Sequence, residues 1–349
     1  MEKINTTITA DLDMDMFESL QNKLNIKTEG YALGRKPLTP LKIIEKCKNT
    51  EILIFEYEFI DNDVINKLSK LKFICCCRGG FKTAIDINAA NNKGILVSHA
   101  PGRNANAVAD FNIGLLLNIT RHITTSNNYI KNGEIQKLKG YVPTFYKDTL
   151  WGLGANSPFE KFKGISLNNK ILGIIGFGNI GQILAKKSQI FGLRIFICDP
   201  YCDASLLKKH NVRRVCLERL LKESDFVSLC CSVTPETKQL INKDKLSIMK
   251  KSSFLINTSR GELINENDLI FALKKKKIAG AALDVFIEEP IKQDHPFLKL
   301  GNLMLTPHIA GSSEEIKKIT TIMVINNLKD YLNGKLPRNA ANSEIFITK

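Results

Sequence analysis

The stretch ILGIIGFGNIGQILAKKSQIFG, residues 171–192, decides the fold. Its first five residues predict a buried strand, and QILAKKSQIF predicts a helix. The turn between them fits the GxGxxG pattern as Gly176-Phe177-Gly178-Asn179-Ile180-Gly181. In this context the first glycine allows a tight turn, the second lets the backbone approach a pyrophosphate, and the third permits close helix–strand packing. Because the helix N-terminus also offers N–H groups to phosphates, the whole turn predicts a dinucleotide site.

An acid ends the next strand along the chain. RIFICD (194–199) closes with Asp199, eighteen residues after Gly181, and Pro200 and Tyr201 follow. A carboxylate at this place can bond both ribose hydroxyls and would repel a 2′-phosphate. We therefore predict that Asp199 and Pro200 belong to the cofactor site and that the cofactor is NAD rather than NADP. The alternative, a glycine-rich turn without a ligand, is disfavoured by the ordered strand, fingerprint, helix and acid.

Short apolar runs alternate with helical patterns on both sides of this stretch. They fall into two series, at 52–56, 73–77 and 95–98, and at 171–176, 194–199, 226–231, 253–257, 279–285 and 302–306. Such alternation predicts an α/β fold with parallel sheets covered by helices on both faces. Between the series, 104–123 predicts a helix buried on more than one side. The following segment, 133–164, has loop composition but many aromatic residues, so we expect it to pack on another surface, such as a partner subunit.

Composition narrows the class of protein. The 349 residues allow about two domains, and no apolar run is long enough for a membrane helix. The formal net charge is +15, but only 10 of the 50 basic residues are Arg and no cluster interleaves them with aromatics, so we predict no nucleic-acid partner. Nine Cys lack the paired spacing of a metal site, so we predict no bound metal and reduced thiols in a cytoplasmic protein.

Charged residues follow three strands of the second series. Arg260 comes after SFLIN, Glu288 and Glu289 come after AGAALDV, and His308 comes after NLMLT. Ligands of open parallel sheets bind beyond the carboxyl ends of the strands. There Arg260 can hold a carboxylate bidentately, His308 can exchange a hydroxyl proton, and a glutamate can fix and stabilise the imidazolium. With a nicotinamide cofactor, these groups predict interconversion of 2-hydroxy and 2-keto acids.

Alternatives stay open at these positions. An isolated His at a strand end is often structural, and Arg260 could pair with a surface acid. Position alone does not choose between Glu288 and Glu289. His99 ends a strand of the first series and is a weaker candidate for the same site, whereas His295 is interpreted as a loop residue.

The motifs together resemble the D-isomer-specific 2-hydroxyacid dehydrogenases, whose members include phosphoglycerate dehydrogenases and glyoxylate/hydroxypyruvate reductases. The resemblance runs from about 53 to 344. It rests on the combination of seven motifs: CRGGFKTAIDINAA (77–90), HAPGRNANAVADFNIGLLL (99–117), ILGIIGFGNIGQILAKKSQIFG (171–192), SVTPETKQLIN (232–242), LINTSRGELINENDLIFAL (255–273), AALDVFIEEP (281–290) and LTPHIAGSS (305–313).

The resemblance implies a role for each matching residue. The catalytic set would be Arg260, Glu289 and His308, because the family acid directly precedes the Pro. The remaining implied contacts fall into two groups. The substrate would meet Arg78, Gly79, Gly80 and Asn104. The dinucleotide would meet Val233, Thr234, Pro235, Thr258, Ser259 and Asp284, with Asp284 on the nicotinamide carboxamide.

The resemblance also implies the architecture: two doubly wound parallel-sheet domains, with a Rossmann dinucleotide-binding domain inserted into a smaller flavodoxin-like substrate domain. The substrate domain would comprise 1–103 and 312–349, and the NAD-binding domain 104–311. The 104–123 helix and the aromatic segment would form the interface of a homodimer. The implied activity is hydride transfer between nicotinamide and C2 of a small acid. The alternative is a scaffold of the same fold that senses NADH with little turnover.

Three positions depart from the commoner family pattern. Asn265 replaces an Asp, which puts a helix cap in question, although Asn caps nearly as well. Phe81 replaces a frequent Pro and is expected to reshape the pocket wall. Glu56 stands where relatives that use phosphoglycerate often carry an Arg, and a carboxylate there would repel a phosphate. We therefore expect an unphosphorylated substrate. Formate-oxidising relatives typically place Gln at position 289, so Glu289 disfavours that reaction.

Overall fold

The computed structural model describes residues 2–134 and 157–347. The chain divides into two compact units. The larger unit spans Ala105–Ser312 and interrupts the smaller one, which runs up to Asn104 and resumes at Ser313. The larger unit is therefore an insertion in the sequence of the smaller unit.

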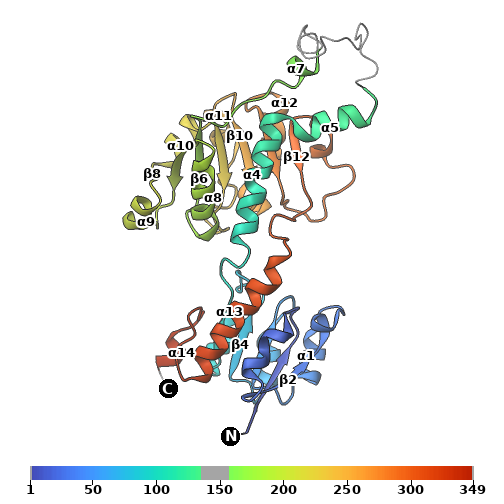
Figure 1. The fold of residues 1–349 in the computed structure, drawn as a ribbon, viewed down its shortest axis with the longest axis vertical. Coiled ribbons are helices and arrows are strands. Elements are labelled where there is room, and N and C mark those ends of the chain that lie inside the picture. The colour runs from blue at the N-terminus through green and yellow to red at the C-terminus, as the bar shows by residue number, and fades with distance from the viewer. Residues whose placement is uncertain (1, 135–156, 348–349) are drawn as a thin grey trace. The chain divides into compact units, whose positions relative to one another are not determined.

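The larger unit is built on a seven-stranded parallel sheet (Figure 1). Its strands are β6 (Ile171–Ile175), β7 (Arg194–Cys198), β8 (Arg213–Arg214), β9 (Phe226–Leu229), β10 (Phe254–Asn257), β11 (Gly280–Leu283) and β12 (Leu303–Leu305). Their order across the sheet is β12-β11-β10-β9-β6-β7-β8. The order reverses direction at β6, which is the switch point where doubly wound sheets bind dinucleotides. This unit therefore has the Rossmann architecture that the sequence predicted.

Helices cover both faces of this sheet. They are α4 (Ala105–Arg121), α5 (Ile123–Lys131), α7 (Pro158–Lys161), α8 (Asn179–Ile190), α9 (Ala204–Lys209), α10 (Leu217–Glu223), α11 (Lys243–Ile248) and α12 (Glu266–Lys274), with the 3-10 turns η4 (Gly261–Leu263) and η5 (Pro296–Lys299). Helices α4 and α8 run side by side on one face, and α10, α11 and α12 pack on the other.

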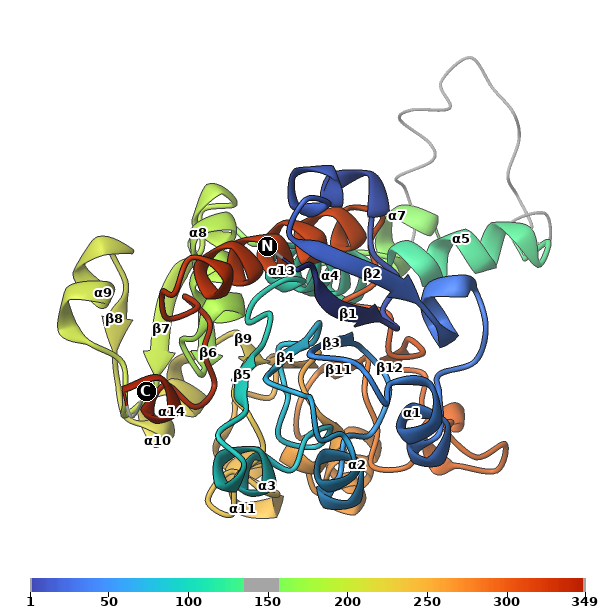
Figure 2. The same cartoon turned by 90° about the horizontal axis from the view of Figure 1, so that it is seen from below.

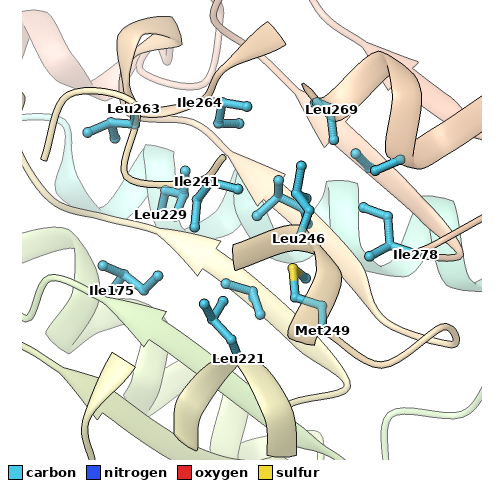
Figure 3. Packing of buried hydrophobic residues seen from close by; sticks show 14 of the residues in the cluster. Ile175, Leu221, Leu229, Ile241, Leu246, Met249, Leu263, Ile264, Leu269 and Ile278 are labelled. Carbon is cyan, nitrogen blue, oxygen red and sulfur yellow. The ribbon is translucent and has the colours of Figure 1, made fainter. Parts of the chain in front are cut away.

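Period-two alternation in the strands produces these two layers. In β6, Leu172 and Ile174 belong to the core beneath α4 and α8, whereas Ile171 and Ile175 belong to the core beneath α10–α12. Figure 3 shows the second core, in which Ile175 lies among side chains of the covering helices. Strands buried on both faces must be apolar throughout, which is why they appear in the sequence as continuous apolar runs.

The smaller unit has a five-stranded parallel sheet. Its strands are β1 (Ile4–Ile8), β2 (Leu24–Thr28), β3 (Ile52–Phe55), β4 (Phe73–Cys76) and β5 (Leu96–Ser98). The order β2-β1-β3-β4-β5 is that of flavodoxin-like folds. Its helices are α1 (Pro40–Lys46), α2 (Asn62–Lys67), α3 (Ile87–Asn92), α13 (Glu315–Leu332) and α14 (Glu344–Ile347), with the 3-10 turns η1 (Met14–Leu20) and η2 (Gly30–Leu33). Figure 2 shows α13 and the α1–α3 group on opposite sides of the sheet.

Two strands of this sheet have no counterpart in the sequence-based prediction. INTTI in β1 and LNIKT in β2 mix polar and apolar residues. Strand β2 lies at the sheet edge, so its alternate side chains face solvent and its apolar signal is weak. Strand β1 contains Thr6 and Thr7, which are buried; the hydroxyl of Thr7 shares a hydrogen bond with that of Thr50. Buried threonines hide a strand from a hydrophobicity pattern.

The consecutive cysteines follow the strand alternation. Cys75 belongs to the core on the α13 side, whereas Cys76 belongs to the core on the α1–α3 side. Burial raises the pKa of the Cys75 thiol to about 12 and that of Cys76 to about 11, so both stay protonated at neutral pH. All nine cysteines are free. The cysteine run is therefore strand packing rather than a chelating group.

The predicted 104–123 helix ends earlier than expected. Helix α4 stops at Arg121, His122 adopts a left-handed conformation with φ of 57°, and α5 continues in a new direction. Helix α5 buries none of its residues, and Ile123 and Ile130 are more than half exposed. Most of the aromatic segment, including Tyr141, Phe145, Tyr146 and Trp151, lies outside the described residues. Within 2–134 and 157–347, no helix has the length and apolarity to cross a membrane.

Candidate active site

The carboxyl ends of the strands in the larger unit carry the predicted chemistry. The glycine turn follows β6, Asp199 follows β7, and Arg260 follows β10. Asp284 and Glu289 follow β11, and His308 follows β12. Because all these strands are parallel, their carboxyl ends lie along one edge of one sheet.

The glycine turn is tightly packed at its first and third glycines and open at its second. Gly176 has a φ of 94°, and a Cβ there would lie 2.7 Å from the backbone of Cys230. A Cβ on Gly181 would overlap the carbonyl oxygen of Gly176, so only glycine lets α8 start this close to β6. A Cβ on Gly178 would meet nothing within 4 Å, which leaves open space before the first amides of α8. These features fit a bound pyrophosphate.

Asp199 is anchored to this turn. Its Oδ2 accepts from the backbone N–H of Phe177 at 2.7 Å, and its Oδ1 accepts from the N–H of Tyr201 at 2.9 Å. Each carboxylate oxygen keeps a further lone pair for a ribose hydroxyl. The carboxylate is thus held beside the place where the glycine turn would bind phosphates.

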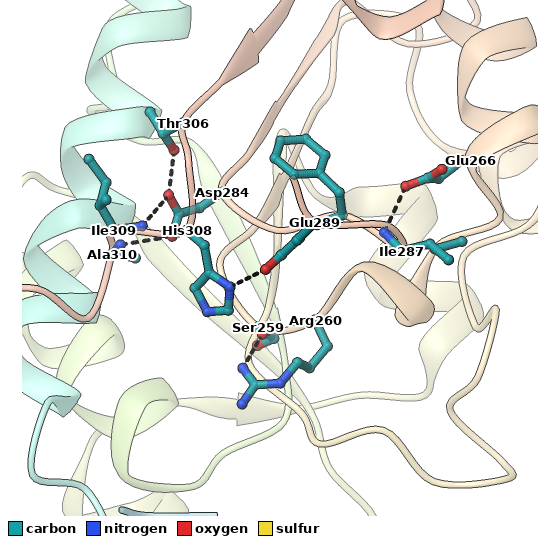
Figure 4. A network of polar contacts seen from close by, with 11 residues as sticks. Ser259, Arg260, Glu266, Asp284, Ile287, Glu289, Thr306, His308, Ile309 and Ala310 are labelled. Carbon is teal, nitrogen blue, oxygen red and sulfur yellow. Dashed lines mark hydrogen bonds and ion pairs between the residues drawn. The ribbon is translucent and has the colours of Figure 1, made fainter. Parts of the chain in front are cut away.

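His308 and Glu289 form a hydrogen-bonded pair (Figure 4). Nδ1 of His308 lies 2.7 Å from Oε2 of Glu289, and both side chains remain partly exposed. The other carboxylate oxygen accepts from the N–H of Phe286 at 3.0 Å. Partial burial opposes ionisation of Glu289, but its hydrogen bonds to His308 and Phe286 and the nearby charge of Arg260 hold its pKa below the ordinary value. The carboxylate is therefore ionised and able to stabilise an imidazolium.

The neighbouring acid is oriented differently. Glu288 pairs with Lys292 at 2.8 Å, and both side chains are exposed. Position in the sequence left Glu288 and Glu289 as rivals, and the geometry separates them because only Glu289 contacts His308.

Asp284 holds the His308 loop. It is fully buried, and its Oδ1 accepts from the hydroxyl of Thr306 and the N–H of Ile309, while its Oδ2 accepts from the N–H of Ala310 at 2.7 Å. His308 itself has a φ of 56°, a strained conformation for a residue with a Cβ. The buried carboxylate, bonded on both sides of His308, over-determines the loop and maintains that strain. In this structure the carboxylate serves the loop, and its predicted contact with nicotinamide stays a prediction.

Arg260 lies in a loop that was only partly foreseen. Its Nη1 donates to the carbonyl oxygen of Ser259 at 2.6 Å. Asn257, fully buried at the end of β10, donates to the carbonyl of Arg260 and accepts from the N–H of Ser259. A Cβ on Gly261 would overlap the backbone carbon of Phe286. Asn257 and Gly261 therefore set the Arg260 loop against the Glu289 turn, and the only sequence signal for them was their place beside the Arg.

The predicted cofactor residues Thr258 and Ser259 have internal partners. The amide nitrogen of buried Asn112, on α4, donates to the hydroxyls of Ser228 and Thr258 at 2.8 and 3.2 Å. The Ser259 hydroxyl donates to the carbonyl of Leu229 at 2.8 Å. These bonds tie the ends of β9 and β10 together and to α4. The Val233–Pro235 segment forms an exposed turn after β9, in which the hydroxyl of Thr237 accepts from the N–H of Thr234.

The smaller unit carries the glycine loop that was predicted to bind substrate. The carbonyl of Arg78 accepts from the N–H of Ala100 at 3.1 Å. The carbonyl of Gly79 lies 2.9 Å from Nδ1 of His99, whose ring packs on Phe81. Burial outweighs this hydrogen bond and lowers the pKa of His99, so its neutral form donates from Nδ1. His99 therefore supports the loop, and Gly79 and Gly80 remain exposed. Asn104 lies just before α4, at the end of the first segment of this unit.

Glu56 is not the free carboxylate that was expected from the sequence. It is buried and paired with Arg103, with 2.6 Å between Oε1 and Nη2, and the two side chains are only 7% and 15% exposed. Nη1 of Arg103 also donates to the hydroxyl of Thr320 at 3.3 Å. The guanidinium compensates the charge of Glu56, so direct repulsion of a phosphate by a free carboxylate is not supported by this geometry.

A Rossmann sheet with a glycine turn, an anchored acid and a His–Glu pair defines the class of dinucleotide-dependent dehydrogenases. The family model "D-isomer specific 2-hydroxyacid dehydrogenase, NAD binding domain" matches residues 113–310. A glyoxylate reductase of Thermococcus litoralis is 35% identical over 318 residues, which cover 90% of this chain and 91% of that protein. The chain belongs to the D-isomer specific 2-hydroxyacid dehydrogenase family, and its cofactor is NAD(H).

Two further comparisons bear on substrate and fold. A D-3-phosphoglycerate dehydrogenase of Methanocaldococcus jannaschii is 36% identical over 307 residues, which cover 87% of this chain. Those residues span about half of that longer protein, 54% of its length. The solved structure of a glyoxylate reductase from Paecilomyes thermophila is 26% identical and superposes with a TM-score of 0.77, covering 99% of this chain and 100% of that one. Relatives with this fold therefore carry different substrate names.

Proposed function

We propose that the protein interconverts a small 2-keto acid and its D-2-hydroxy acid with NADH or NAD. The observation that carries the proposal is the 2.7 Å pairing of His308 with Glu289, at the same sheet edge as the glycine turn and Arg260. A histidine whose ring is hydrogen-bonded to an ionised carboxylate is well suited to general acid–base catalysis. Family membership supports the same chemistry.

The cofactor would lie on the larger unit. Its pyrophosphate would be held by the turn of residues 176–181 and its adenosine ribose by Asp199. The predicted lining also includes Pro200, the Val233–Pro235 turn, Thr258, Ser259 and Asp284. When bound, the nicotinamide supplies or accepts the hydride at C2 of the substrate.

The protein residues would supply proton transfer and orientation. Because Nδ1 of His308 is engaged by Glu289, its Nε2 is the nitrogen available to a substrate oxygen. In reduction His308 donates a proton to the developing alkoxide, and the Glu289 carboxylate stabilises the imidazolium beforehand. Arg260 would hold the substrate carboxylate and polarise the adjacent carbonyl. We assign substrate binding in the smaller unit to Arg78, Gly79, Gly80 and Asn104.

We propose that the substrate is unphosphorylated, for a reason different from the one the sequence suggested. Arg103 is the cation paired with position 56, and both of its terminal nitrogens are engaged, by Glu56 and by Thr320. A phosphate would have to displace a buried ion pair to use this guanidinium, which is unfavourable.

A substrate panel tests the function. Oxidation of NADH should be followed with glyoxylate, hydroxypyruvate, pyruvate, bulkier keto acids and four-carbon sugar acids, with 3-phosphoglycerate oxidation as the phosphorylated arm. We expect turnover with at least one small keto acid and none above background with 3-phosphoglycerate. If the protein binds NADH but turns over no keto acid, the alternative is favoured, namely a scaffold of the same fold that senses NADH.

We propose a homodimer in the cytoplasm. The exposed Ile123 and Ile130 on α5, next to the long α4 helix, support an apolar contact with a second copy. The nine free cysteines suit a reducing compartment. Sedimentation of the full chain should give twice the monomer mass, and the double variant Ile123→Ser with Ile130→Ser should shift it toward the monomer.

A further inference from the structure

Two consecutive peptide units in the active-site turn are held from three directions. The N–H of Phe286 donates to Oε1 of Glu289, and the N–H of Ile287 donates to Oε1 of Glu266, each at 3.0 Å. The same Phe286–Ile287 peptide presses on Gly261, where a Cβ would overlap its carbon and nitrogen. Figure 4 shows Glu266 reaching the turn from the side away from His308. Consecutive amides are thus bonded by two different glutamates.

Glu266 is placed for this contact by the helix it begins. It is the first residue of α12, and the preceding Asn265 caps that helix by accepting from the N–H of Asp268 at 3.1 Å. Asn265 therefore caps α12, although the family more often has Asp at this position. Because the cap residue serves the helix amides, the Glu266 carboxylate is free to bond Ile287. A negative charge in the first helical turn is also electrostatically favourable.

His295 faces the second oxygen of Glu266. Its Nδ1 accepts from the N–H of Phe297 at 3.3 Å, which leaves a proton on Nε2, 3.6 Å from Oε2 of Glu266. The two side chains are only 19% and 23% exposed. Phe297 is buried and its ring packs near that of Phe286, so the His295 segment contacts the turn directly through Phe297 and indirectly through Glu266. A second Glu–His pair therefore backs the turn that carries the first.

We propose that Glu266 is a positioning residue for the reaction and that His295 supports it. A peptide unit is planar, so fixing the N–H of Ile287 fixes the whole plane between Phe286 and Ile287. The orientation of that plane fixes the neighbouring N–H of Phe286, which donates to Glu289. The same plane packs against Gly261, the residue that follows Arg260. Glu266 thereby sets the spacing between Arg260 and the Glu289–His308 pair. This inference rests on the proposed function.

Three variants and a control isolate the role of Glu266. Glu266→Ala removes the acceptor, Glu266→Asp keeps the charge at the helix start but shortens the reach, and Glu266→Gln keeps an acceptor without charge. Glu288→Gln is the matched control, since Glu288 is an exposed acid of the same turn that pairs with Lys292. We expect kcat of the full-length protein to fall about tenfold in Glu266→Ala and Glu266→Asp. Glu266→Gln should recover most of it, and Glu288→Gln should match the wild type.

A pH profile separates positioning from general destabilisation. If Glu289 is held less firmly, the imidazolium of His308 is less stabilised, and the alkaline limb of keto-acid reduction moves to lower pH. We expect this shift in Glu266→Ala and Glu266→Asp, with unchanged NADH affinity by fluorescence titration. A purely structural role would lower the melting temperature and leave the limb in place. Wild-type kcat and limb in both variants would overturn the proposal.

A readout without turnover keeps the two proposals distinguishable. The proton between His308 and Glu289 should give a far-downfield proton NMR signal that is absent in His308→Ala. We expect this signal to broaden or vanish in Glu266→Ala and Glu266→Asp and to persist in Glu266→Gln and Glu288→Gln. If the wild type turns over no keto acid, the proposed function fails, while this signal still tests the positioning. A signal unchanged in every Glu266 variant would refute it.

Discussion

The charged side chains near the strand ends of the two sheets differ in their exposure to solvent. In the larger unit Glu289 and His308 are partly exposed, and buried groups such as Asp284 hold their backbone. In the smaller unit the charged pair Glu56–Arg103 is largely buried, while Gly79 and Gly80 are exposed. From this difference we expect the larger unit to offer reactive side chains to a substrate, and the smaller unit to offer backbone groups.

Replacing His308 by Ala should have the largest effect. Loss of a general acid lowers turnover by about 10²- to 10⁴-fold. We expect that loss in kcat for keto-acid reduction, with NADH affinity close to the wild type in a fluorescence titration. Turnover that survives the change would remove His308 from the mechanism and, with it, the reactive character assigned to the larger unit.

Glu56→Gln should act on stability instead. Removing one partner of a buried ion pair leaves the other charge uncompensated and costs about 3 kcal/mol, at the low end of the usual range because Arg103 keeps some exposure. Chemical denaturation should show this loss, while NADH affinity is retained. A matched change in the exposed pair, Asp63→Asn beside Lys67, should cost less than about 1 kcal/mol. Equal losses would mean that burial of Glu56 is unimportant.

Glu289→Gln tests the electrostatics of the pair. The pKa of Glu289 lies below its ordinary value, so its ionised form is favoured by folding. The stabilisation from this group is complete above the ordinary value and is lost only as the pH falls through the lowered one. Wild-type reduction should therefore persist to about pH 5. The variant should lose roughly 10- to 100-fold in kcat with its alkaline limb at lower pH; a wild-type limb would show that Glu289 does not stabilise the imidazolium.

Asp199→Asn should alter cofactor choice. The amide can still accept one backbone N–H but no longer repels a 2′-phosphate and bonds ribose hydroxyls more weakly. We expect the ratio of kcat/KM for NADH over NADPH to fall about tenfold. Equal use of both cofactors by the wild type would contradict the assignment of Asp199.

His99→Ala should have the smallest effect. The variant removes the bond to the Gly79 carbonyl but leaves the Arg78 carbonyl bonded to Ala100. We expect KM for the keto acid to rise roughly threefold to tenfold, with little change in kcat. A drop in kcat comparable to that of His308→Ala would instead make His99 a reactive group and erase the contrast between the two units.

Particular elements show how far sequence reasoning reached. Strands buried on both faces, such as β6 and β10, were found because each is a continuous apolar run. Strands β1 and β2 were missed because threonines and an edge position weaken that signal. The helix break at His122 was also missed, since a left-handed residue without Gly leaves no mark in the sequence.

The sequence alone determined the α/β class, the dinucleotide turn and the three strand ends that carry Arg, Glu and His. These follow from local rules, because glycine spacing and hydrophobic periodicity act within a few residues. The family resemblance already pointed to Glu289 over Glu288, and the structure shows the contact of Glu289 with His308. Only the tertiary structure decided that Arg103 neutralises Glu56 and that Glu266 bonds the turn. Each of these depends on where distant segments meet, and long-range packing and charge pairing are not written in any short stretch of sequence.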